Sequence, residues 1–147
     1  MDLETMKSKW KKILLWSGGF VLAAIAVAKV VDINERPKRV ASILNIPSLP
    51  KSARVIDCNA AFIPTDVVDT CSIEIDANDF PDLLSGYNFS ESPTTETSHS
   101  AVFTKVGPEF PLAVEFTAVP KELKHGGHVK VLADRERRRA VIDLYVE

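Results

Sequence analysis

Four arginines lie close together near the end of the sequence, in the segment DRERRR that spans residues 134–139. Guanidinium groups bind carboxylates and phosphates through parallel N–H donors, so such a cluster on an exposed turn is typical of a docking surface. The same cluster would also simply keep a hairpin tip soluble. We therefore predict that the partner-binding residues include Arg135, Arg137, Arg138 and Arg139.

The charges of the chain are unevenly distributed. Residues 55–104 contain nine acidic residues and no lysine or arginine, whereas residues 120–139 contain seven basic residues and three acidic ones. Either the two regions neutralise each other across the strands of one sheet, or one of them meets a charged partner. Residues 32–147 carry 13 basic and 18 acidic side chains, so their net charge is 13 − 18 = −5. This acidic balance does not favour nucleic acid as a partner.

Cys58 and Cys71 are equally far from the midpoint between Pro64 and Thr65, which lies in a predicted hairpin turn. In the simplest antiparallel register they face each other at a separation that a disulfide accepts. We therefore predict a possible disulfide between them. The alternative is a longer turn, which would shift the register and leave two buried thiols.

Other reactive residues show no complete pattern. His125 and His128 form an H-G-G-H sequence without a third ligand nearby, and the acidic residues of 76–82 are better explained by helix capping than by calcium binding. The sequence has no nucleophile elbow and no glycine-rich phosphate loop. We predict no catalytic residue, no metal site, no cofactor and no small-molecule substrate.

An apolar segment, residues 13–31, precedes all of these residues and would hold them near a membrane. Lys29 is its one charged residue. A bilayer core requires about 20 apolar residues, so this segment is expected to be a single transmembrane anchor behind a basic head, residues 1–12. A cleaved signal peptide is the main alternative, because Ala26-Val27-Ala28 fits a cleavage site. A buried core helix is the third interpretation.

A short basic head usually stays in the cytoplasm, which would place the rest of the chain outside. The basic residues flanking the segment nearly balance, so the charge rule does not decide the orientation. We expect a single-pass membrane protein with a cytoplasmic N-terminus and an extracytoplasmic, periplasmic domain. The alternative is export after signal cleavage.

The rest of the chain has room for one small domain. Residues 32–52 are expected to be a tether with a short helix, in which Pro37 occupies the first turn and Val40, Ile43 and Leu44 share one face. Residues 53–147 are predicted to form an α+β domain with a mostly antiparallel sheet. In the hairpin of 53–76, Ile56 and Cys58 should face the core together with Cys71.

A short helix should follow this hairpin, with Asn78 or Asp79 as its cap and Gly86 as its left-handed stop. Residues 87–100 are rich in turn-forming residues and predict a mobile loop. Further strands are expected at 101–106, 112–119, 128–133 and 140–146, with the arginine-rich segment at the tip of the last hairpin.

The chain resembles, over about 40 residues, small bacterial membrane-anchored or lipoprotein-like extracytoplasmic domains of unknown function. The resemblance is carried by residues 49–55, the hairpin, Asp79-Phe80 and the segment 83–86. The chain departs from the lipoprotein pattern, because no cysteine follows the apolar segment and lipidation is therefore not implied. The resemblance implies an exported and tethered α+β module.

These observations favour a membrane-tethered, non-enzymatic binding or accessory domain. Its expected partner is another membrane or envelope protein, and an inhibitor or immunity protein belongs to this class. The alternative function is a small hydrolase-like or metal-dependent envelope enzyme whose site is assembled from residues far apart in the sequence. A concave pocket with converging polar groups would favour the enzyme, and a flat charged face would favour the binding domain.

Overall fold

The computed structural model describes residues 3–62, 64–95, 106–123 and 125–147, with side chains from residue 19 onward except that of Phe62. It comprises two compact units, residues 1–35 and 36–147. The first unit is helical. The second contains the end of the same helix, a sheet and a short second helix.

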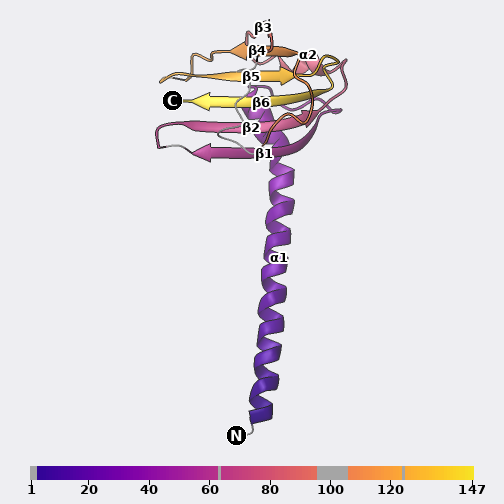
Figure 1. Cartoon of the computed structure of the whole chain (residues 1–147), viewed down its shortest axis with the longest axis vertical. Helices are drawn as coiled ribbons and strands as arrows, with labels where there is room; N and C mark the ends of the chain where they lie inside the picture. The colour runs from indigo at the N-terminus through magenta and orange to yellow at the C-terminus, as the bar shows by residue number, and fades with distance from the viewer. Residues whose placement is uncertain (1–2, 63, 96–105, 124) are drawn as a thin grey trace. The chain divides into compact units, whose positions relative to one another are not determined.

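The second unit is built on a six-stranded antiparallel sheet with the strand order β1-β2-β6-β5-β4-β3, which can be followed in Figure 1. The predicted α+β class is therefore confirmed. The strands are β1 (Arg54–Phe62), β2 (Val67–Glu74), β3 (Ser90–Pro93), β4 (Val114–Ala118), β5 (Gly127–Ala133) and β6 (Arg139–Val146).

One face of the sheet carries the main hydrophobic core. Alternate residues of the central strands point to this face, among them Ile73 of β2, Val131 of β5 and Ile142 of β6, which are at most 1% exposed. The end of α1 (Leu3–Ile43) and the helix α2 (Phe80–Leu83) pack against them. We call the opposite side of the sheet the outer face.

The helix α1 differs from the sequence prediction, because it runs without a break through the region where a separate short helix was expected. Pro37 lies inside it and not in a first turn. Proline has no N–H, so the helical hydrogen bond to residue 33 is missing close to the boundary between the two units, at 35/36. Val40, Ile43 and Leu44 share the buried face that the spacing predicts.

The C-terminal end of α1 is closed by its own backbone and is joined to the sheet by an arginine–carboxylate pair. Asn45 has a left-handed φ of 54°, and the N–H of Ile46 bonds to the carbonyl of Ala41 at 3.0 Å, which is the Schellman arrangement of a helix end. Arg39 donates two hydrogen bonds to the carboxylate of Asp69 on β2, at 2.6 and 2.7 Å. These contacts orient the last turn of α1 over the core.

The expected membrane anchor covers residues 13–31. Within the described residues, none of the helices combines the length and the apolar character that a membrane crossing requires. Residues 13–18 of that segment belong to the part of α1 whose side chains are not described.

The first hairpin has the predicted strands but contains a bulge. Val55 pairs with Ile73 and Asp57 pairs with Ser72, so Ile56 has no partner in the register. The extra residue reverses the alternation of side chains, and Val55 packs on the core while Ile56 is 43% exposed. The prediction that Ile56 shares the core face of Cys58 was therefore wrong.

The region after the hairpin also needs two corrections. The helix α2 is a single turn, and the side chain of Asp79 does not cap it but accepts a hydrogen bond from Ser52 at 2.6 Å. Gly86 does not have a positive φ. A Cβ at this position would collide with the backbone of Leu44 and Asn45, so the absence of a side chain permits close packing against the end of α1.

Part of the loop predicted at 87–100 is a strand. Residues 90–93 form β3, which pairs with β4 at the edge of the sheet, while residues 96–100 lie outside the described residues. Of the strand expected at 101–106, residues 101–105 also lie outside them, and Val106 is not in a strand. The strand predicted at 112–119 is shorter; its Phe116 belongs to the core, and its Ala118 is buried.

Candidate functional site

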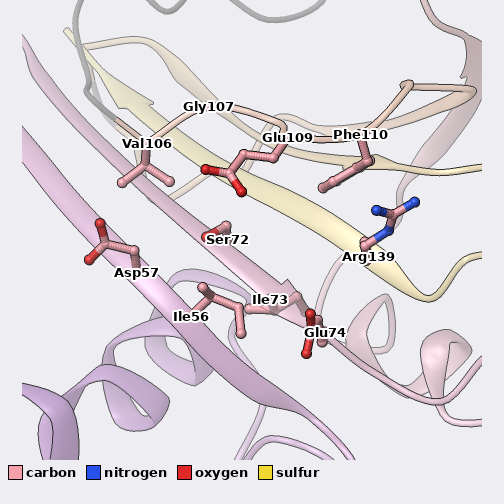
Figure 2. A pocket seen from close by; sticks show the side chains of 10 residues that line it. All are labelled: Ile56, Asp57, Ser72, Ile73, Glu74, Val106, Gly107, Glu109, Phe110 and Arg139. Carbon is pink, nitrogen blue, oxygen red and sulfur yellow. The ribbon is translucent and has the colours of Figure 1, made fainter.

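A groove of about 470 Å³ lies on the outer face of the sheet, between the bulged hairpin and the segment 106–110 (Figure 2). We call it the outer groove. It is lined by Ile56, Asp57, Ser72, Ile73, Glu74, Val106, Gly107, Glu109, Phe110 and Arg139. Strands β1, β2 and β6 thus contribute one wall, and the segment before β4 contributes the other.

The side chains of this groove combine an apolar surface with an excess of negative charge. Ile56 and Phe110 supply exposed or half-exposed apolar surface. Three carboxylates, those of Asp57, Glu74 and Glu109, line the same groove as the guanidinium of Arg139. In Figure 2 the Glu109 carboxylate points from the segment 106–110 toward Ser72 on β2. The groove therefore favours a positively charged ligand over an anion.

Two of the carboxylates are paired with arginines outside the groove, one on α1 and one on the edge strand β1. Arg36 contacts Asp57 at 3.1 Å and also donates to the backbone carbonyl of Ile56 at 2.9 Å. Arg54 contacts Glu74 at 2.8 Å. Both carboxylates are substantially exposed, with 57% exposure for the Asp57 side chain and 49% for that of Glu74, so solvent weakens each pair.

The guanidinium of Arg139 is engaged within the protein. Its Nε lies 3.1 Å from Oδ2 of Asp134, and its Cζ lies 4.9 Å from the centre of the Phe110 ring. A cation at this distance from an aromatic face is attracted by the ring quadrupole. The outer groove thus already contains one cationic side chain stacked on its aromatic wall.

The arginine-rich tip connects β5 to β6 and is organised by Asp134. This residue is 6% exposed, and its Oδ1 accepts hydrogen bonds from the N–H groups of Arg138 at 2.8 Å and Arg139 at 3.3 Å. A second hollow, of about 530 Å³, lies beside the tip and shares Glu74 and Arg139 with the outer groove.

The structure separates the four arginines into two kinds. Arg137 contacts Glu91 at 3.0 Å and lies 5.4 Å from the ring centre of Phe116, and Arg139 has the contacts described above. Arg135 is exposed, and the Arg138 side chain is 68% exposed with a long 3.8 Å contact to Glu136. Arg135 and Arg138 are therefore the members of the cluster that present their charge to solvent.

Loss of the Asp134 carboxylate should destabilise the tip. Burial raises the pKa of Asp134, but the hydrogen bonds from Arg138 and Arg139 and the charge of Arg139 outweigh this effect, so its pKa lies below the ordinary 3.8. The charged form is thus favoured by folding, and its contribution is present above pH 3.8 and is lost as the pH falls through the lowered pKa.

Asp134→Ala should reduce the free energy of unfolding by about 1–3 kcal/mol at neutral pH, because two partly buried N–H groups lose their acceptor. Asp134→Asn is the matched control, since it keeps an oxygen at Oδ1, and it should cost less. Urea denaturation followed by circular dichroism at pH 7 measures both variants. Equal stability of the Ala variant and the unmodified chain would contradict this role.

Further along the outer face, polar side chains of neighbouring strands form a second group. The ring of His128 lies 5.4 Å from that of Tyr145, whose hydroxyl is 3.1 Å from Oδ2 of Asp66. Lys130 contacts Glu115 at 3.1 Å. Burial and the positive charge of Lys130 lower the pKa of His128 below 6.5, against the opposing charges of Asp143 and Glu115. This group stabilises the sheet across its strands and lies outside the groove.

The two cysteines face each other in the register of β1 and β2, and the structure joins them by a disulfide. Cys71 is fully buried on the core face. The bond connects the edge strand β1 to its neighbour. Its presence in the cell remains a prediction.

No group of three or more His, Cys, Asp or Glu side chains in the described part of the chain could hold a metal ion. His125 and His128 are separated by Gly126 and Gly127, which both have a positive φ. His125 thus lies in the turn before β5, and His128 belongs to β5 itself.

Comparison with models of protein families, with curated proteins and with solved structures finds no match.

Sequence reasoning found Arg139 but missed the rest of the outer groove. Glu109 and Phe110 come from a segment without regular structure, and Ser72 is an ordinary polar residue of a strand. The sequence offers one signal for this wall, because Phe110 stands between Pro108 and Pro111, where an aromatic side chain on a stiff segment can pack against a sheet.

Proposed function

We propose that the protein is a membrane-tethered, non-enzymatic binding domain in which residues 13–31 anchor the chain and residues 36–147 contact another membrane or envelope protein. The observation that carries the tether is the exposed apolar surface of α1. Phe20 is 78% exposed, Leu22 is 70% exposed and Val27 is 63% exposed.

These apolar side chains surround the helix and do not form a stripe. Successive residues of a helix are about 100° apart, so the exposed Phe20, Val21 and Leu22 point in three different directions. A helix that is apolar on all sides is normally buried in protein or in lipid. The proposed anchor contains a single charge, Lys29, whose long side chain can reach the interface. Alkaline carbonate should leave the anchored chain with the membranes.

The binding role is supported by the outer face of the sheet. The outer groove there is concave, but two of its carboxylates, those of Asp57 and Glu74, are paired with arginines outside its lining, so its polar groups do not converge as those of an enzyme site would. Arg138 lines the neighbouring hollow, and Arg135 is exposed in the same tip. We propose that the domain is extracytoplasmic, as the short basic head favours. The disulfide in the structure supports this side, since such bonds persist in oxidising compartments.

The role of the tip can be tested with the double change of Arg135 and Arg138 to Gln. Replacing all four arginines would also remove the contacts of Arg137 and Arg139 and so confuse docking with folding. The double variant should remain folded and capture less of the membrane partner in a pull-down, most clearly at low salt. Lys121→Gln, at an exposed lysine away from the tip, is the control. Equal capture by the double variant would remove the tip from the binding surface.

A further inference from the structure

The outer groove differs from an ordinary surface depression in its volume, its apolar side chains and its charge. It has a volume of about 470 Å³, within the range of sites that hold small ligands or side chains. It has an apolar side in Ile56 and Phe110. It also has three carboxylates against one guanidinium, which gives the lining a net charge of 1 − 3 = −2.

The charged groups of the groove differ in whether they already have a partner of opposite charge within the protein. Asp57 and Glu74 each contact an arginine outside the lining, and Arg139 is engaged by Asp134 and Phe110. Glu109 is exposed, and within the described residues no arginine, lysine or histidine forms an ion pair with it. Its carboxylate is therefore the group best placed to receive a cation from outside.

The arrangement of charged and apolar side chains in the groove favours a cation with an aliphatic stem over a metal ion. The carboxylates of the groove do not belong to any cluster of three ligands that could hold a metal ion, as noted for the described residues. A cation that also has an aliphatic stem can contact Ile56 and Phe110 while its charged end reaches Glu109. Arg139 shows that a guanidinium already occupies one end of the groove against the Phe110 ring.

We propose that the outer groove binds a lysine or arginine side chain of an extended segment of the partner protein. The stem of this side chain packs on Ile56 and Phe110, and its charged end lies at Glu109. This inference rests on the proposed function, because it names the chemistry of the partner that a binding domain would contact.

The probe is a short capped synthetic peptide of alternating valine and lysine, and the matched control peptide has glutamate in place of every lysine. The full chain is placed in lipid nanodiscs with labelled isoleucine δ1-methyl groups. The methyl signal of Ile56 reports on the groove, while that of the fully buried Ile142, on the other face, reports on the core. NMR titration at low salt gives the dissociation constant.

The lysine peptide should shift the Ile56 signal in a saturable manner without shifting that of Ile142, and the glutamate peptide should not. Glu109→Gln should weaken binding about two- to five-fold, as expected for an exposed ion pair, and Glu109→Lys should weaken it further. Glu122→Gln, at an exposed glutamate outside the groove, should leave the dissociation constant unchanged.

Binding of both peptides with equal strength, shifts confined to residues outside the groove, or an unchanged constant for Glu109→Gln would each overturn the inference. A failure of this inference can be distinguished from a failure of the proposed function. A chain that stays in membranes but does not bind the peptide disproves only the groove, whereas a chain released from membranes disproves the tether even if the peptide binds.

Discussion

Leu83→Ala should lower the free energy of unfolding by about 2–5 kcal/mol, because it removes a large, fully buried side chain from the core. Leu83 belongs to α2, which has only four residues and cannot be stable by itself. The packing of Leu83 and Phe80 on the sheet therefore holds this turn in place. The ring centre of Phe80 lies 5.7 Å from that of Phe116 on β4.

Leu84→Ala is the matched control, since this neighbouring leucine is only partly buried against the core. It should cost clearly less than Leu83→Ala. Urea denaturation of the full chain in nanodiscs, followed by circular dichroism of the sheet, compares the two variants. A larger loss for Leu84→Ala would mean that α2 presents the opposite side to the sheet.

Reduction of the bond between Cys58 and Cys71 should lower the free energy of unfolding by about 3 kcal/mol, because the bond closes a loop with a sequence separation of 13. The effect arises mainly in the unfolded chain, whose freedom the bond restricts. Denaturation of the same preparation with and without a reductant measures it, and no residue has to be replaced.

The oxidised state itself is read by mass spectrometry of chain taken from native membranes. The unfolded chain is treated with an alkylating reagent before and after reduction. We expect alkylation of both cysteines only after reduction. Alkylation of two thiols in the unfolded chain without any reductant would disprove the bond and remove its support for an extracytoplasmic domain.

The parts of the fold that the sequence predicted are those with a regular local pattern. The alternation of apolar and polar residues gave the hairpin of β1 and β2 and the pairing of β5 with β6, and equal spacing from the turn placed Cys58 opposite Cys71. The buried face formed by Val40, Ile43 and Leu44 followed from helical spacing.

The parts that it did not predict depend on contacts between distant residues. The bulge at Ile56 cannot be read from an alternation that continues through it. Gly86 was expected to be a left-handed stop, but its role depends on the backbone of Leu44, more than 40 positions away. The short β3 is a strand because β4 offers it an edge, since its own residues are typical of turns.

The candidate site also combines features that the sequence predicted with features that it did not predict. The arginine-rich tip was visible as a local cluster, but its separation into packed and exposed side chains requires Asp134, Glu91 and the aromatic rings. The outer groove lies between the segment 106–110 and the strands β1, β2 and β6, whose residues are far from that segment in the sequence. No local pattern contains both.

The tether and the side of the membrane are tested together by protease treatment of sealed, right-side-out vesicles, followed by alkaline carbonate extraction. If residues 13–31 span the bilayer and the domain lies outside, external protease should degrade residues 36–147, and a short fragment containing residues 13–31 should stay with the membranes after carbonate. An intact chain that carbonate releases from the vesicles, or a domain that the protease cannot reach until detergent is added, would contradict this account.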